Sequence, residues 1–159
     1  MKLYILRHGH APSAAQASVA SDAERPLSPE GRKAAAETAE RLARLGGKPS
    51  LILHSPLKRA VQTAQETARV LSPEKGVQVF PPLANVLPAS ELLAALRKDP
   101  AASVPELLVV GHQPQLGELA ALLCGQIFEL KTAGLIAVEL SAAPRLLWHA
   151  NPGDPDPAP

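Results

Sequence analysis

Two arginines and two histidines stand where apolar runs of this sequence end. Arg7 and His8 directly follow the first run, Arg59 comes shortly after the second, and His112 follows a later one. A guanidinium group binds phosphate oxygens in pairs, and the free N–H groups of a helix N-terminus add further donors. One histidine at a strand end is usually structural, but the four residues together predict a phosphate site.

The pattern of apolar and polar residues alternates between short strands and longer helices. Strands are predicted at 3–6, 51–53, 77–80, 107–110, 135–140 and 146–150, and helices at 29–45, 56–71, 90–98 and 115–123. The alternation predicts an α/β fold, a three-layer sandwich whose mostly parallel central sheet is flanked by helices on both faces. The short connection between the last two strands favours an antiparallel hairpin at the sheet edge. Ligands of open parallel sheets bind beyond the carboxyl ends of the strands, so we expect the four residues to meet there.

Local signals predict where the first two helices begin. Ser28 is a predicted N-cap, with Pro29 at the first helical position. Ser55 and Pro56 repeat this start for the second helix. The segment 11–26 has few large apolar residues and is predicted to be a loop that covers or lines a site.

The size and composition of the chain are those of one globular domain. Its 159 residues are 46% hydrophobic and 19% charged, far from the composition that keeps chains disordered. We expect a single domain at 1–150, followed by a Pro-rich, disordered tail at 151–159. Cys124 is the only cysteine, which excludes an intramolecular disulfide and a cysteine-based zinc site.

Charge and hydropathy also limit the expected partners. Aromatic residues make up 3% of the chain and the formal net charge is +1, which argues against nucleic acid and against an anionic membrane surface. No apolar run has the length of a membrane span, and the run at 1–6 is too short for a signal peptide. We therefore expect a cytoplasmic protein with no membrane partner. No exposed apolar helix face stands out, which favours a monomer.

Three spaced segments carry a resemblance to a known family. The segments 6–11 (LRHGHA), 55–63 (SPLKRAVQT) and 110–114 (VGHQP) resemble, in this order, the three signatures of the histidine phosphatase superfamily. The order and the placement after strands agree, so the resemblance covers residues 2–149 and implies a phosphoglycerate-mutase-like fold. The segment 25–28 (RPLS) also resembles the segment before the first helix of the SixA-type phosphohistidine phosphatases, the small members of the superfamily.

The resemblance implies a role for each residue of the predicted phosphate site. His8 would be the nucleophile and form a phosphohistidine intermediate, while Arg7, Arg59 and His112 would hold the phosphoryl oxygens. Arg25 is a further candidate for contacting the substrate phosphate. Water would then attack the phosphorus, so that the reaction would use no metal and no other cofactor. The positive charges of the arginines would help to keep His8 neutral, as a nitrogen nucleophile must be.

Two features of the sequence favour phosphohistidine on a protein as the substrate. The 52 residues between Arg59 and His112 leave no room for the cap that encloses small substrates in larger members of the superfamily. The segment 80–90 has no carboxylate, whereas many esterase and mutase members place a glutamate there as general acid. Without a general acid, cleavage that releases an alkoxide is slower by about 10²–10⁴-fold. Imidazole is a far weaker base than an alkoxide, so its release needs less help from an acid. We therefore predict a phosphoprotein substrate, such as a histidine phosphotransfer domain, and inorganic phosphate as the product.

Two other functions stay open on the sequence. A small-molecule phosphomonoesterase of the same superfamily would need a proton donor, for which the nearby acids are Asp22, Glu24 and Glu91. Solvated charges and helix-start positions account for all three acids more simply. A non-catalytic phosphate-binding module would keep the arginines and bind phosphate without turnover.

Overall fold

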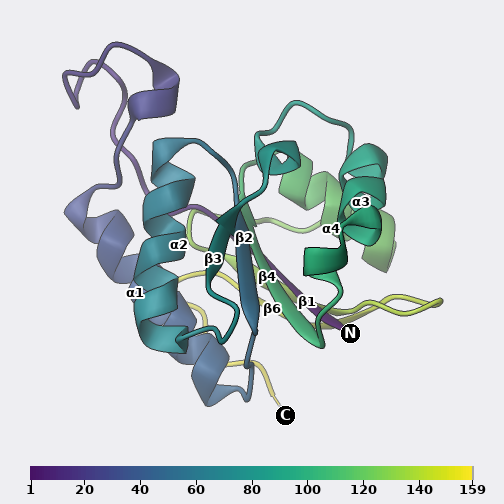
Figure 1. The fold of residues 1–159 in the computed structure, drawn as a ribbon. Helices are drawn as coiled ribbons and strands as arrows, with labels where there is room; N and C mark the ends of the chain where they lie inside the picture. The colour runs from purple at the N-terminus through teal and green to yellow at the C-terminus, as the bar shows by residue number, and fades with distance from the viewer. Residues whose placement is uncertain (159) are drawn as a thin grey trace.

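The computed structural model describes residues 1–158 as a six-stranded sheet between two layers of helices (Figure 1). The strands are β1 (Lys2–Arg7), β2 (Leu51–His54), β3 (Val77–Val79), β4 (Glu106–Gly111), β5 (Leu135–Glu139) and β6 (Arg145–Ala150). The helices are α1 (Pro29–Arg44), α2 (Lys58–Leu71), α3 (Ala89–Lys98) and α4 (Gln115–Cys124), with 3₁₀ turns η1 (Asp22–Glu24), η2 (Pro81–Leu83) and η3 (Pro100–Ala102). The predicted α/β sandwich is confirmed.

The order of the strands brings the carboxyl ends of β1, β4 and β2 together. The sheet runs β3-β2-β4-β1-β5-β6, in which β4 pairs in parallel with both β1 and β2. Arg7 lies opposite Gly111, and His54 lies opposite Val110. The three segments that leave these strands therefore start side by side. Strands β5 and β6 form the predicted antiparallel hairpin, with β6 at the edge.

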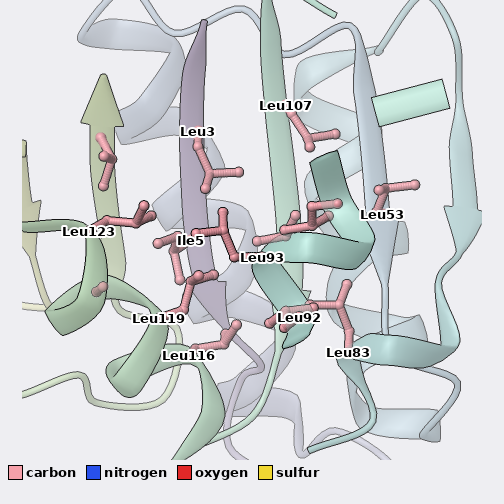
Figure 2. Close-up of a cluster of buried hydrophobic side chains, with 14 of the residues drawn as sticks. Leu3, Ile5, Leu53, Leu83, Leu92, Leu93, Leu107, Leu116, Leu119 and Leu123 are labelled. Carbon is pink, nitrogen blue, oxygen red and sulfur yellow. The ribbon is translucent and has the colours of Figure 1, made fainter. Parts of the chain in front are cut away.

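Each face of the sheet is covered by one pair of helices. Helices α1 and α2 pack together on one face, and α3 and α4 pack together on the other (Figure 1). Successive side chains of a strand point to opposite faces, so Leu3 and Ile5 join the core under α3 and α4 while Tyr4 and Leu6 join the core under α1 and α2. Figure 2 shows the leucines of α3 and α4 packed on Leu3, Ile5 and other strand residues. A strand buried on both faces explains the continuous apolar run of β1.

The two helix starts that the sequence predicted have different outcomes. Ser28 caps α1 as expected, because its side chain accepts a hydrogen bond from Gly31 N and Pro29 is the first helical residue. The prediction for Ser55 and Pro56 is wrong, because α2 begins only at Lys58 and has no side-chain cap. The Ser55 hydroxyl instead accepts from Leu57 N at 3.1 Å and contacts His112.

Two segments were predicted to lack regular structure, residues 11–26 and the tail after residue 150. The 11–26 segment is a loop apart from the turn η1, and only Ala11 within it is buried. Residues 151–158, expected to be part of a disordered tail, form no helix or strand, but they lie against α1. Asp156 pairs with Arg41 and Arg44 of that helix, since acids in the segment meet the basic end of α1.

None of the helices within residues 1–158 is both long and apolar enough to cross a membrane.

Candidate active site

A pocket of about 260 Å³ opens beyond the carboxyl ends of β1 and β4. Its lining consists of Arg7, His8, His10, Ala11, Arg25, Arg59, Asn85, His112, Gln113 and Thr132. All five residues predicted for the site are in this lining. They come from the ends of β1 and β4, from the first turn of α2 and from the 11–26 loop, so the structure brings together what the sequence separates.

His8 is buried at the end of β1 and its ring is held in one orientation. Its Nδ1 lies 2.7 Å from the carbonyl oxygen of Gly9, and because a carbonyl only accepts, Nδ1 carries the proton. The neutral ring therefore keeps a lone pair on Nε2. Burial, together with the positive charges of Arg59, Arg7 and Arg25, lowers the pKa of His8 to about 4. The ring is neutral at physiological pH.

The backbone after His8 is fixed by the helical layer on that side of the sheet. Gly9 N donates to the Thr63 hydroxyl at 3.0 Å, and that hydroxyl donates to the carbonyl of Arg59. A Cβ atom on Gly31 would lie only 2.2 Å from the His10 carbonyl oxygen, so α1 approaches the loop as closely as glycine allows. These contacts hold the Gly9 carbonyl, and through it the His8 ring.

Two guanidinium groups reach the pocket from different elements. Arg7 donates through Nη1 to the Leu130 carbonyl at 2.9 Å. Arg59, which is only 7% exposed, donates through Nη1 to the main-chain oxygen of Asp22 at 2.9 Å and through Nη2 to its carboxylate at 3.0 Å. Backbone acceptors therefore set the orientation of both arginines.

His112 stands across the pocket from His8, with the two ring centres 5.1 Å apart. Its Nε2 lies 2.7 Å from the Ser55 hydroxyl, which leaves Nδ1 as its second hydrogen-bonding atom. Burial is the main cause of a fall in the pKa of His112 to about 3, and repulsion from the protonated form of His8 and from the nearby arginines adds to it. Ser55 is a residue that sequence reasoning assigned to helix capping, and the motif that contains it was the available signal for its place in the site.

Three buried nitrogens of the pocket residues have no partner within the described part of the chain. They are Nε of Arg7, Nε of Arg59 and Nδ1 of His112. An unpaired buried polar group lowers the stability of the fold by about 1–3 kcal/mol, so several of them are seldom found together without a functional reason. All three belong to side chains that line one pocket. Guanidinium and imidazole N–H groups around one pocket suit an acceptor-rich anion such as a phosphoryl group.

Arg25 both lines the pocket and anchors the 11–26 loop. Its Nε donates to the Pro12 carbonyl at 2.8 Å, its Nη2 to the Ala11 carbonyl at 3.0 Å and its Nη1 to Asp22 at 2.9 Å. Hydrogen bonds from Arg25 and then Arg59 hold the pKa of the Asp22 carboxyl below its usual value. Asp22 is thus the one acid of the three considered from the sequence that contacts residues of the pocket lining.

Asn85, Gln113 and Thr132 also line the pocket, and sequence reasoning missed them. Asn85 has a left-handed backbone (φ 68°), donates through Nδ2 to the Gln113 carbonyl and accepts at Oδ1 from Gln115 N. It ties the segment after η2 to the segment that carries His112. An asparagine among prolines is a turn signal, but the partner of its side chain lies 28 residues away in the chain.

Within residues 1–158, no group of three or more His, Cys, Asp or Glu could hold a metal ion.

The chain matches a family model described as the histidine phosphatase superfamily (branch 1) over residues 3–85. Phosphohistidine phosphatase SixA of Escherichia coli is 35% identical over 96% of this chain and 94% of its own length. An uncharacterised protein of Picosynechococcus sp. is 41% identical over 95% of this chain and 92% of its own. A solved structure of the protein histidine phosphatase SixA complexed with tungstate has a TM-score of 0.85 and 29% identity, and covers 96% of this chain and 97% of that one.

The matched residues 3–85 include the first two motifs of the sequence and all of β1, α1, β2 and α2. The SixA sequence and the SixA structure each cover 96% of this chain, and so extend the likeness well beyond residue 85. The resemblance inferred from three short motifs is therefore confirmed. The chain belongs to the histidine phosphatase superfamily, branch 1, and is a phosphatase.

Proposed function

We propose that this phosphatase hydrolyses phosphohistidine on a protein, through a covalent phosphohistidine intermediate on His8. The observation that carries the proposal is the state of the His8 ring, whose Nδ1 is committed to the Gly9 carbonyl so that Nε2 keeps its lone pair. In this proposal Arg7, Arg59 and His112 hold the phosphoryl oxygens. Arg25 contacts the same group from the 11–26 loop.

In the first step, Nε2 of His8 attacks the phosphorus of the substrate. A P–N bond forms to His8 while the P–N bond of the substrate breaks, and the departing imidazole nitrogen takes up a proton from solvent. One P–N bond replaces another, so the main task of the protein is to stabilise the charge on the transferring group. In this proposal the guanidinium groups of Arg7 and Arg59, which line the pocket, are the donors for its oxygens.

In the second step, water attacks the phosphorus of the phosphorylated His8. The P–N bond breaks, its electron pair returns to Nε2, the water gives one proton to solvent and inorganic phosphate leaves. The proton stays on Nδ1, which donates it to the Gly9 carbonyl throughout, so the ring returns as the same tautomer. The phosphorylated ring is positively charged, and this hydrogen bond is stronger in that state because its donor is charged.

The protonation of the site favours phosphohistidine over phosphate esters. No Asp or Glu is among the described residues that line the pocket. The pKa of His112 is lowered to about 3 and that of Asp22 is also lowered, so neither group holds a transferable proton at neutral pH. An alkoxide leaving group needs such a proton, whereas imidazole departs with less help.

The protein part of the proposed substrate has two lines of support. The pocket lies at the surface, and no additional domain covers it in the described part of the chain, so a side chain on another protein can reach it. The Escherichia coli relative that is 35% identical is named phosphohistidine phosphatase. A histidine phosphotransfer domain is the kind of phosphoprotein that fits this chemistry.

The experiment that tests the proposal measures phosphate release from a histidine-phosphorylated phosphotransfer domain and from a panel of phosphate esters. We expect fast release from phosphohistidine, slow release from the esters, and loss of both in the His8→Ala variant. A ³²P-labelled substrate should leave a transient, acid-labile label on the wild-type chain and none on the variant. The His54→Ala variant is a matched control, because its histidine is also buried at a strand end but lies outside the pocket lining.

The other outcomes separate the alternatives. Faster turnover of esters than of phosphohistidine would make the protein a small-molecule phosphomonoesterase. Phosphate binding without turnover of any substrate would make it a binding module.

A further inference from the structure

Asp22 is an anion placed at the edge of a site that is proposed to bind an anion. Its carboxylate receives a hydrogen bond from Nη2 of Arg59 at 3.0 Å and one from Nη1 of Arg25 at 2.9 Å. Both arginines line the pocket. The acid therefore contacts two of the three guanidinium groups that the proposed function gives to the phosphoryl group.

The two sides of this contact differ in exposure. The Arg59 side chain is 9% exposed, while that of Asp22 is 64% exposed and belongs to the turn η1 of the 11–26 loop. An ion pair with one partner in water contributes little, so the Asp22 carboxylate can give way to a stronger anion. The carboxylate is a weak, local competitor for the donors of the buried arginine.

The carboxylate also acts on a bound phosphate through its charge. Two neighbouring like charges repel each other, and more strongly where the surroundings are less polar than water. One of the two contacts that orient Arg59 is independent of that charge, because its Nη1 donates to the main-chain oxygen of Asp22. Charge and orientation can therefore be separated by substitution of the side chain.

We propose that Asp22 sets the affinity of the site for phosphate: it competes for Arg59 and Arg25 and repels the anion, so that inorganic phosphate binds weakly and leaves after hydrolysis. This inference rests on the proposed function. A site with three arginines and two imidazoles would otherwise hold its product tightly. A protein substrate has further contacts outside the pocket, whereas free phosphate has none, so the competing acid selects against the product.

The test is the binding of inorganic phosphate to the full chain, measured by calorimetry and as the inhibition constant against phosphohistidine hydrolysis. We expect Asp22→Asn to bind phosphate about fivefold more tightly than the wild type, which corresponds to the loss of about 1 kcal/mol of repulsion. The amide keeps an acceptor for Nη2, and the main-chain oxygen is untouched. Glu24→Gln is the matched control, because this acid is on the same turn but accepts only from Ala20 N, and it should leave phosphate affinity unchanged.

Each result separates this inference from the proposed function. If Asp22→Asn and Asp22→Ala bind phosphate as the wild type does, or more weakly, Asp22 serves to position Arg59 and the inference is overturned. If the wild type and Arg59→Ala bind phosphate equally, the pocket is not the phosphate site, and the proposed function fails together with the inference. A tighter complex in Asp22→Asn should also lower KM, and should lower kcat where phosphate release limits turnover.

Discussion

The strand-end residues of the pocket and the 11–26 loop are built in opposite ways. His8, Arg59 and His112 are between 3% and 8% exposed, and buried hydrogen bonds fix the two histidine rings. In the 11–26 loop only Ala11 is buried, the other residues are exposed or half-buried, and the loop projects beyond the layer of α1 and α2 (Figure 1). One side of the site is held by the core of the protein, and the other by a few arginine contacts at the surface.

This contrast indicates a division of tasks. Phosphoryl transfer needs donors that stay in place while charge develops, and a buried scaffold supplies them without reorganisation. The choice of ligand needs contacts that can be exchanged, and an exposed loop with Asp22 and Arg25 supplies those. Substitutions among the strand-end residues should therefore change the rate of chemistry, while substitutions in the loop should change affinity.

The largest effect is expected from Arg59→Ala. The variant loses a buried donor of the proposed phosphoryl site, and the removal of one such donor typically lowers kcat by about 10²–10³-fold. Steady-state kinetics with a histidine-phosphorylated protein measure it. Arg69→Ala is the control on the same helix, because Arg69 is exposed and pairs with Glu66 instead. A loss below about tenfold in Arg59→Ala would show that the strand-end side does not carry the chemistry.

The next effect concerns the packing that holds the loop after His8. In Gly31→Ala the added Cβ would meet the backbone of His10 at 2.2 Å, and a backbone atom cannot turn aside as a side chain can. We expect the free energy of unfolding to fall by about 2 kcal/mol, as overpacking in a tight site usually costs. Denaturant unfolding measures it, with Lys33→Ala at an exposed position of α1 as the control. An unchanged midpoint would mean that α1 does not fix this loop.

The fold and four of the site residues were accessible from the sequence because their signals are local. Apolar runs that end abruptly gave the strands, and Arg7, His8, Arg59 and His112 lie directly after them or in the next turn. Parallel pairing then needs only the alternation of strands and helices to bring such ends together. The three motifs strengthened the same prediction.

The remaining parts of the site depend on contacts between distant segments. Ser55 has the local signal of a helix cap, but its hydroxyl is used by His112, 57 residues away. The sequence alone suggests that Asp22 is a solvated acid, but in the structure its carboxylate contacts Arg59, which is 37 residues away in the chain. Likewise Asp156 meets Arg44 only in the folded chain. Side-chain partners of this kind are set by tertiary packing, which a pattern along one sequence does not contain.

The protonation of His8 tests the buried side of the pocket, because its lowered pKa affects both stability and activity. Burial lowers its pKa from 6.5 to about 4, so the unfolded chain takes up a proton near pH 6.5 that the folded chain takes up only near pH 4. The free energy of unfolding should therefore fall as the pH falls from 6.5 to 4. The neutral ring, and with it kcat/KM, should persist below pH 6 and decline only as the pH approaches 4.

An NMR titration of the histidine ring protons measures this prediction directly, with His8→Ala used to assign the signal. A midpoint near 6.5 would contradict it, because the ring would then behave as a solvated imidazole. Asp22→Asn should leave the acid limb of kcat/KM close to its place, since burial is the largest cause of the lowered pKa of His8 and Asp22 is not among the causes.

The smallest effect is expected from Arg25→Ala, in the 11–26 loop. Its guanidinium is partly exposed and three of its hydrogen bonds hold the loop rather than the strand ends, so its loss should raise KM about fivefold with little change in kcat. Kinetics on the phosphorylated protein measure both constants, and Arg145→Ala, on the exposed edge strand β6, is the control for general charge effects. A loss in kcat as large as that of Arg59→Ala would remove the division between the two sides of the pocket, because it would place Arg25 among the donors that stabilise the transferring phosphoryl group. A change confined to KM means that the loop selects the ligand while the buried side of the pocket carries out the transfer.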